Sequence, residues 1–158
     1  MTRFLIASPN SGAGKTIITL AIMRIFKRTG LKYQPAKSGP DYIDPKFHEM
    51  ASGEPSVNLD AWAMQKPEIK DVAGDGNLIV EGAMGLFDGA GISGLGSSAN
   101  LANILSLPIV LVVDTGKMAH SIAATVQGFK NFDPSINLAG VVLNRVASDR
   151  HLNLLTTA

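Results

Sequence analysis

Residues 7–16, ASPNSGAGKT, hold the side chains with the clearest chemical potential in this sequence. In a loop that ends in Gly-Lys-Thr, small residues let backbone N–H groups surround a phosphate, while the lysine neutralises phosphate charge and the threonine hydroxyl binds Mg²⁺. Pro9 stands where such a motif expects its first glycine, which is tolerable if the missing N–H faces away from the phosphate. The alternative is a glycine-rich turn without a ligand. The residues predicted to bind nucleotide phosphates are Gly12, Ala13, Gly14, Lys15 and Thr16.

Glu81 is the second candidate, because it directly follows the apolar residues 78–80. An unpaired carboxylate beside buried residues is costly, so a metal ion or a cationic side chain is the expected partner. A Mg²⁺ ion bound to phosphates also takes one or two carboxylates. We therefore predict that Thr16 and Glu81 are metal ligands, with a solvent-facing strand-end carboxylate as the alternative for Glu81.

The stretch KSGPDYIDP, residues 37–45, places two carboxylates three residues apart. Asp44 precedes Pro45, so it is either the N-cap of a helix or a catalytic group, and the sequence leaves both open. Asp41 has no comparable structural explanation, which makes it the better candidate for the metal or the substrate. Lys37, at the end of an expected strand, is placed to bind a substrate carboxylate.

Other polar and aromatic residues have simpler interpretations. Asp88 and Asp114 each precede turn residues, so a turn and a functional role are equally open for both. His48 and His120 lie on predicted helices without acidic or histidine partners at ligand spacing, so we expect them to be solvated surface groups. Trp62 is expected to serve packing rather than base stacking.

Apolar runs alternate with helical periodicities along the chain, so the predicted fold class is α/β. Expected strands cover residues 4–7, 32–36, 77–80, 109–113 and 138–143. Expected helices follow the phosphate loop and cover 45–51, 97–105 and 119–132, with a last one beginning near residue 148. This alternation implies a mainly parallel sheet covered on both faces, in a three-layer domain of the P-loop NTPase type. Ligands of such sheets bind at the carboxyl ends of the strands, where the candidate residues lie.

Composition limits the classes of function. Of the 158 residues, 46% are hydrophobic, which is enough for a packed core. The net charge of +1 provides no field that would attract nucleic acid or an anionic membrane. No apolar run approaches the roughly 20 residues that span a bilayer, so we expect a cytoplasmic protein without nucleic-acid or membrane partners. The absence of cysteine excludes disulfides, thiolate metal sites and a cysteine nucleophile within these residues.

Several motifs occur in an order that resembles the cobyrinic acid a,c-diamide synthase family, and the likeness extends to dethiobiotin synthetase. The two most specific are GPDYIDP and VEGAMGLFDG, at residues 39–45 and 80–89. The others are the phosphate loop, NLDAW at 58–62, VVDTGKMAHSIAATVQGF at 112–129 and GVVLNRV at 140–146. The resemblance covers essentially the whole chain and implies the ATP-binding domain of an amide ligase.

Members of that family use ATP and Mg²⁺ to amidate two acetate side chains of a tetrapyrrole in cobalamin biosynthesis, with ammonia from glutamine. A carboxylate resists ammonia because it is anionic and lacks a leaving group, so phosphoryl transfer first converts it into an acyl phosphate. By this likeness the catalytic residues are Lys15, Asp41, Asp44 and Glu81, with Asp41 or Asp44 joining Thr16 and Glu81 at the metal. Asn144 would bind adenine, and Tyr42 and Asp88 would lie with Lys37 at the tetrapyrrole dicarboxylate.

Two features differ from related proteins. Many ATPases of the wider class carry an extra lysine five residues before the loop lysine, where this chain has Asn10. The glutaminase region of the family relies on a cysteine nucleophile, so we expect residues 1–158 to be a synthetase domain without that region and incomplete at its C-terminus. A homodimer stays open. The alternatives are amidation of a sirohydrochlorin-type tetrapyrrole, dethiobiotin-like carboxylate activation and a non-enzymatic ATP switch of the partitioning ATPase type.

Overall fold

The computed structural model describes residues 1–158 and contains one six-stranded sheet in which all neighbouring strands are parallel. Its strands are β1 (Arg3–Ala7), β2 (Gln34–Ser38), β3 (Val57–Leu59), β4 (Leu78–Glu81), β5 (Pro108–Asp114) and β6 (Asn137–Asn144). They lie in the order β3-β2-β4-β1-β5-β6, so β4 and β1 occupy the centre. Because the strands are parallel, their carboxyl ends meet along one edge of the sheet.

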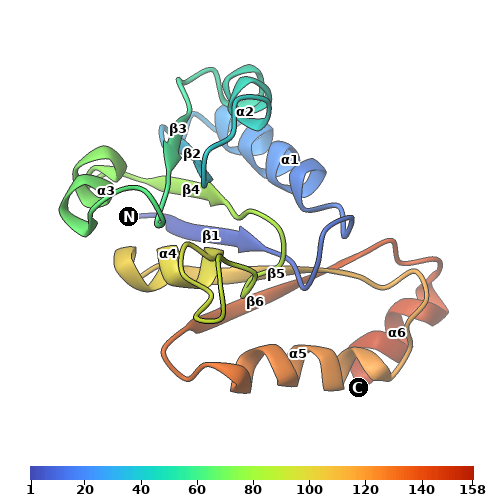
Figure 1. The fold of residues 1–158 in the computed structure, drawn as a ribbon. Coiled ribbons are helices and arrows are strands. Elements are labelled where there is room, and N and C mark those ends of the chain that lie inside the picture. Colours follow the sequence, from blue (N-terminus) through green and yellow to red (C-terminus); the bar gives the residue numbers. More distant parts are fainter.

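Six helices connect the strands: α1 (Lys15–Arg28), α2 (Asp44–Ser52), α3 (Lys66–Ala73), α4 (Ser98–Leu105), α5 (Ser121–Phe132) and α6 (Asp149–Thr157). Figure 1 shows α1 and α2 together on one side of the sheet, with α4 and α5 on the other side. Successive strand residues reach opposite layers: Leu5 and Ala7 join the larger buried cluster, whereas Ile6 packs with Met23 of α1. The predicted three-layer α/β fold is confirmed. None of the helices combines the length and hydropathy that a bilayer-spanning segment needs.

The structure departs from the sequence-based elements between residues 32 and 73. β2 runs from Gln34 to Ser38, later than predicted, so Lys37 lies inside the strand rather than beyond its end. β3 and α3 were not predicted. β3 has only 3 residues, too few for an alternating pattern to stand out. α3 carries a capping box between Gln65 and Glu68, which is a local signal that the sequence did contain.

The glycine-rich residues 82–96 form a loop that packs against the phosphate loop. The N–H of Leu86 donates to the carbonyl oxygen of Ser8 at 2.9 Å, and the Leu86 side chain is fully buried. A Cβ at Gly85 would lie 2.5 Å from the carbonyl oxygen of Pro9, so only glycine fits there. These contacts fix the two loops against each other at the carboxyl edge of the sheet.

Candidate functional site

The phosphate loop joins β1 to α1 and encloses a cavity. Gly12 and Gly14 have φ angles of 86° and 89°, a conformation that favours glycine, and a Cβ at Gly14 would overlap the side-chain amide of Asn144. α1 begins at Lys15 with no side-chain cap and no acidic residue in its first turn, so its N-terminal N–H groups and dipole are available to an anion. The cavity has a volume of about 310 Å³ and is lined by Ser8, Ser11, Gly12, Gly14, Lys15, Thr16 and Ile17.

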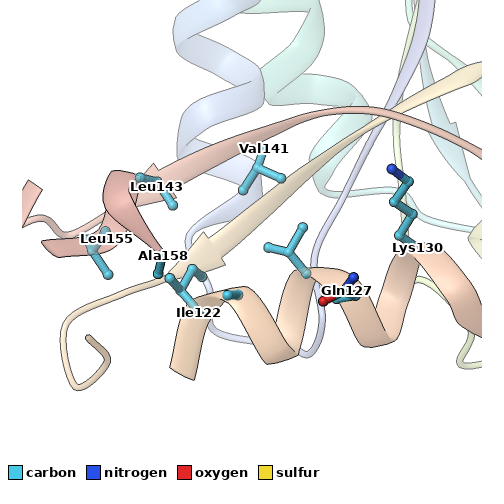
Figure 2. A pocket seen from close by; sticks show the side chains of 9 residues that line it. Ile122, Gln127, Lys130, Val141, Leu143, Leu155 and Ala158 are labelled. Carbon is cyan, nitrogen blue, oxygen red and sulfur yellow. The ribbon is translucent and has the colours of Figure 1, made fainter. Parts of the chain in front are cut away.

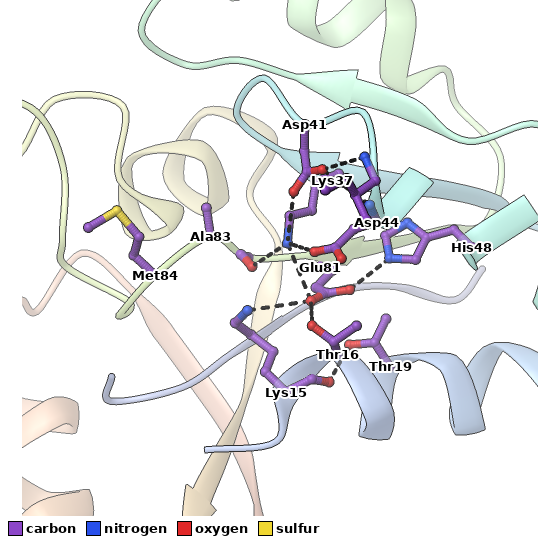
Figure 3. Close-up of polar contacts among 12 residues, drawn as sticks. Lys15, Thr16, Thr19, Lys37, Asp41, Asp44, His48, Glu81, Ala83 and Met84 are labelled. Atoms are coloured by element: carbon purple, nitrogen blue, oxygen red, sulfur yellow. Dashed lines mark hydrogen bonds and ion pairs between the residues drawn. The ribbon is translucent and has the colours of Figure 1, made fainter. Parts of the chain in front are cut away.

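Glu81 ends β4 in the centre of the sheet, in register with Ile6 of β1 and Lys37 of β2. Its side chain is fully buried. Oε1 accepts a hydrogen bond from Oγ1 of Thr16 at 2.6 Å and lies 3.4 Å from Nζ of Lys15. Figure 3 shows these groups converging between β4 and the start of α1. Of the two partners expected for Glu81, a metal ion or a cationic side chain, the structure shows the cationic side chains of Lys15 and Lys37, and metal binding by Glu81 stays a prediction.

Burial and charge act in opposite directions on the pKa of Glu81. Burial alone would raise it, but the hydrogen bond with His48, the charge of Lys37, and contacts with Thr16 and Lys15 hold the pKa at about 2. Burial lowers the pKa of Lys15, and the neighbouring Glu81 carboxylate opposes that shift. Glu81 is therefore ionised at neutral pH and places a full negative charge beside the phosphate loop.

Lys37 joins Glu81 to the carboxylates of the GPDYIDP stretch (Figure 3). Its Nζ donates to Oδ2 of Asp44 at 2.5 Å and lies 3.3 Å from Oε1 of Glu81 and 3.9 Å from Oδ2 of Asp41. The Lys37 side chain is only 5% exposed. In this structure its ammonium group is thus engaged by carboxylates of the chain itself, and binding of a substrate carboxylate stays a prediction.

Asp41 forms a turn that was not expected from its sequence context. Its Oδ1 accepts hydrogen bonds from the N–H of Ile43 at 2.8 Å and the N–H of Asp44 at 3.1 Å, at the start of α2. This is the turn in which an aspartate binds the backbone two and three residues ahead. Asp44 is the first residue of α2 and not its N-cap, which is Ile43, and its carboxylate is bound to Lys37 instead. Asp41 thus makes the helix-start hydrogen bonds that the sequence offered to Asp44, and the metal, catalytic or substrate roles of both aspartates stay predictions.

The oxygen ligands around the loop fit Mg²⁺ in the way that nucleotide sites use it. No group of three or more His, Cys, Asp or Glu side chains is arranged to hold a metal ion. Mg²⁺ does not need such a cage, because it keeps water and phosphate ligands and takes one or two protein carboxylates. The Thr16 hydroxyl and Glu81 carboxylate are adjacent hard oxygen ligands beside the phosphate cavity, so this pair fits the ion.

His48 is buried, and the expectation that it is a solvated surface group is wrong. The side chain has no exposed area, Nε2 lies 2.7 Å from Oε2 of Glu81, and Nδ1 lies 3.2 Å from Oγ of Ser56. The prediction failed because the partner is distant in sequence and is reached only when α2 packs beside α1 and β2. One signal was available, since His48 lies four residues after Asp44 and so occupies the same side of the helix.

The other flank of the phosphate loop is formed by the carboxyl ends of β5 and β6. Nδ2 of Asn144 donates to the carbonyl oxygen of Ala13 at 2.8 Å. Arg145 has a φ of 61°, unusual for a residue other than glycine, and its guanidinium donates to the carbonyl oxygen of Gly12 at 3.2 Å and pairs with Asp114. Arg145 was not among the residues predicted from the sequence. Asn144 lies beside the loop, and its contact with adenine stays a prediction.

Asp114 and Asp88 both act in turns. Oδ1 of Asp114 accepts from the N–H of Gly116 at 2.9 Å, and this hydrogen bond, with Arg145, lowers the pKa of the Asp114 carboxyl. Oδ2 of Asp88 accepts from the N–H of Gly85 at 2.9 Å. The predicted turn after Asp114 is confirmed, whereas Asp88 closes a turn that starts at Gly85 instead of preceding one, and contact of Asp88 with substrate stays a prediction.

The aromatic candidates lie at the surface. Tyr42 is 85% exposed, next to the aspartates of the GPDYIDP stretch, and no hydrogen bond restrains its hydroxyl. Trp62 is 64% exposed, so the packing role expected for it is wrong. Its backbone and Cβ instead cover Gly96, where a side chain would not fit. His120 is exposed, as predicted.

A second cavity, of about 400 Å³, lies between α5, β6 and the last residues of the chain (Figure 2). Its walls are mostly apolar and include Ile122, Val126, Val141, Leu143 and Leu155. None of the predicted site residues lines it, so it is separate from the phosphate site.

Comparison with known proteins agrees with this geometry. The family described as "CobQ/CobB/MinD/ParA nucleotide binding domain" matches residues 4–158. Hydrogenobyrinate a,c-diamide synthase of Brucella anthropi is 50% identical over the whole chain, which spans 37% of that relative. The corresponding synthase of Rhizobium meliloti is 49% identical over the whole chain, which spans 38% of its length. The chain therefore covers little more than a third of these relatives.

Among solved structures, chloroplast FtsY from Physcomitrella patens superimposes with a TM-score of 0.56 over 90% of this chain and 49% of that one. The sequence identity is 17%, so this likeness concerns the fold alone. The match over residues 4–158, together with the open phosphate loop, shows that the chain belongs to the CobQ/CobB/MinD/ParA nucleotide-binding domain family.

Proposed function

We propose that this chain is the ATP-binding part of an amide ligase that activates acetate carboxylates of a tetrapyrrole for amidation in cobalamin biosynthesis. The observation that carries the proposal is the buried, ionised Glu81 with its Oε1 2.6 Å from the Thr16 hydroxyl and 3.4 Å from Lys15, beside the cavity of the phosphate loop. The two relatives above are named hydrogenobyrinate a,c-diamide synthase. Hydrogenobyrinate is therefore the first substrate to test.

The proposed reaction has two steps, phosphoryl transfer to the substrate and attack by ammonia. A substrate carboxylate oxygen bonds to the γ-phosphorus of ATP as the bond to the β,γ-bridging oxygen breaks, which gives ADP and an acyl phosphate. Ammonia then bonds to the acyl carbon, phosphate leaves and a proton is lost, which gives the amide. Phosphoryl transfer needs mainly positioning and neutralised charge, because its reactants are both anions.

The residues at the phosphate loop supply that positioning. Backbone N–H groups of Gly12 to Thr16 would hold the β-phosphate, and Lys15 would contact the transferred group. Bound Mg²⁺ would neutralise phosphate charge. Thr16 and Glu81 would hold the ion, with Asp41 or Asp44 as the further carboxylate. Lys37 would exchange its present carboxylate partners for those of the substrate.

The substrate side of the site lies at the exposed end of the same edge. Tyr42, 85% exposed, offers an aromatic face to a macrocycle, and Asp88 lies near the end of the VEGAMGLFDG stretch, which packs against the phosphate loop. Asn144 would bind adenine on the opposite flank. In a glutamine-dependent reaction the ammonia would come from a separate glutaminase region or subunit, because this chain has no cysteine to serve as the nucleophile.

Isothermal titration with ATP in the presence of Mg²⁺ tests the phosphate loop directly. We expect the unaltered chain to bind and Lys15→Ala to lose most of the affinity. Lys46→Ala is the matched control, since Lys46 is 74% exposed and pairs only with Glu49. Equal binding by the unaltered chain and Lys15→Ala would overturn the assignment of the phosphate loop.

The reaction itself is tested by incubating the chain with ATP, Mg²⁺ and ammonia. The assay is repeated after adding the part of a glutaminase-containing relative that this chain does not cover. Hydrogenobyrinate, a cobalt-containing cobyrinate and sirohydrochlorin are the substrates to compare. Each amidation exchanges OH for NH₂, so mass spectrometry would show a loss of about one mass unit per reacted carboxylate. If the chain binds nucleotide but none of the three substrates loses mass, the ATP site is supported and a tetrapyrrole substrate is rejected.

A further inference from the structure

His48 is a fully buried ionisable group to which the proposed reaction assigns no role. It lies on the inward side of α2, one helical turn after Asp44. Its Nε2 lies 2.7 Å from Oε2 of Glu81, and both side chains have no exposed area. Burying two polar side chains costs free energy unless they are hydrogen-bonded, and the short contact between Nε2 and the ionised carboxylate provides such a bond.

The two oxygens of Glu81 have different surroundings (Figure 3). Oε1 contacts Thr16, Lys15 and Lys37, all on the side of the phosphate loop and β2. Oε2 has one hydrogen-bond partner, which is His48. Without that partner Oε2 would be a buried, unsatisfied acceptor, and the carboxylate would be free to turn about its last torsion angle toward other donors.

The Ser56 hydroxyl contacts the second ring nitrogen of His48. Its Oγ lies 3.2 Å from Nδ1 of His48 and also lies 3.4 Å from the carbonyl oxygen of Pro35. Nε2 must carry a proton because an ionised carboxylate only accepts. In the neutral ring Nδ1 is then the acceptor, so the Ser56 hydroxyl donates its single proton to Nδ1 rather than to the carbonyl oxygen of Pro35. The ring is therefore fixed at both nitrogens, by a residue just before β3 and by the end of β4.

We propose that His48 is a positioning residue for Glu81, which holds Oε2 so that Oε1 faces the Thr16 hydroxyl and the divalent cation of the phosphate site. This inference rests on the proposed function, since it assigns His48 a part in metal binding by Glu81. α2 thereby contacts the site twice, through Asp44 to Lys37 and through His48 to Glu81. Hydrogen-bond partners of metal ligands act in this way by fixing the ligand's orientation.

Three variants separate positioning from packing. His48→Leu fills most of the volume without a donor. His48→Gln keeps an amide N–H at about the reach of Nε2. Ser56→Ala leaves His48 in place but removes the hydroxyl at Nδ1. For each variant the Mg²⁺ concentration that gives half-maximal ATP binding is measured by titration, with Mn²⁺ paramagnetic resonance as a second measure of metal affinity and thermal unfolding as the check on folding.

We expect His48→Leu to raise the required Mg²⁺ concentration roughly 10- to 100-fold, as removal of such partners does in metal sites. His48→Gln should recover most of this loss, Ser56→Ala should show a smaller increase, and ATP binding measured in EDTA should be the same in all. Metal dependence in His48→Leu equal to that of the unaltered chain would overturn the proposal, as would a His48→Gln variant that folds but is no better than His48→Leu.

If His48→Leu does not fold, the comparison of His48→Gln and Ser56→Ala with the unaltered chain decides. Unchanged metal dependence in Ser56→Ala together with a large loss in the folded His48→Gln would contradict positioning by a directed N–H. Failure of the unaltered chain to bind ATP in an Mg²⁺-dependent way would instead reject the proposed function, so the two failures are distinguishable.

Discussion

The phosphate loop is flanked by two ionic groups that differ in their surroundings. On one side, Glu81 and Lys37 lie in the interior, with 0% and 5% of their side chains exposed. On the other side, Asp114 and Arg145 form a pair in which 35% and 55% of the side chains are exposed. Both groups touch the same loop, at Lys15 and Thr16 from the interior and at Gly12 from the surface.

The difference shows that an ion pair's position decides what its removal does. A buried charge that loses its partner stays in a medium that solvates it poorly, so loss of one member costs far more than the pair contributes. An exposed pair is screened by water and salt, and its members are solvated when separated. We therefore expect the interior group to govern stability and metal binding, and the surface group to adjust the shape of the loop.

Glu81→Gln should have the largest effect. It leaves the ammonium groups of Lys15 and Lys37 close together without the central carboxylate, and we expect a loss of roughly 3–5 kcal/mol in the free energy of unfolding. Turnover should be abolished. Urea denaturation measures the first effect and the amidation assay the second. A variant that keeps its activity would remove Glu81 from the metal site.

The pH dependence of stability should isolate the charge of Glu81. Its pKa is held at about 2, below the ordinary 4.5, so its ionised form stabilises the fold above pH 4.5 and this contribution is lost as the pH falls toward 2. At about 1.4 kcal/mol per pH unit, the difference between the unaltered chain and Glu81→Gln should shrink by ~3 kcal/mol over that interval. Denaturation curves between pH 7 and pH 2 measure it, and a constant difference would contradict the assignment.

Gly14→Ala should have an intermediate effect at the boundary between the two flanks. The φ of 89° and the overlap of the new Cβ with the Asn144 amide should cost roughly 1–3 kcal/mol and weaken ATP binding. Gly128→Ala in α5 is the matched control, because no atom lies within 4 Å of the Cβ that the substitution adds. Glycine is also less favourable than alanine inside a helix. The control should be neutral or slightly stabilising. Similar losses in both variants would show that the strain at Gly14 is unimportant.

Arg145→Ala should have the smallest effect on stability. The variant breaks the exposed pair with Asp114, so we expect a small decrease in melting temperature that disappears in high salt. Because Arg145 also donates to Gly12, the free energy of ATP binding should change by more than the free energy of unfolding does. Calorimetry at low and high salt and ATP titration measure the two effects. A loss of stability as large as that of Glu81→Gln would remove the distinction between the flanks.

Sequence reasoning succeeded where the information was local. The phosphate loop, the strands that surround it and the need of Glu81 for a metal ion or a cationic partner all followed from short stretches of residue types. The reasoning failed where the partner is remote: His48 meets Glu81 across 33 positions, and Arg145 meets Gly12 across 133. The turn formed by Asp41 was missed for a different reason: the proline after Asp44 drew the capping role to Asp44, whereas Asp41 accepts the hydrogen bonds from Ile43 and Asp44.

The contact between the two glycine-rich loops has a practical consequence. Gly85 sits against the carbonyl of Pro9, and Leu86 is bonded to Ser8, so any displacement of the phosphate loop must be transmitted to residues 82–96. Ile92, between the bridged residues Ala90 and Leu95 of that segment, is fully accessible. A fluorescent label on a cysteine introduced there, in a chain with no other thiol, would serve as an optical sensor of nucleotide occupancy.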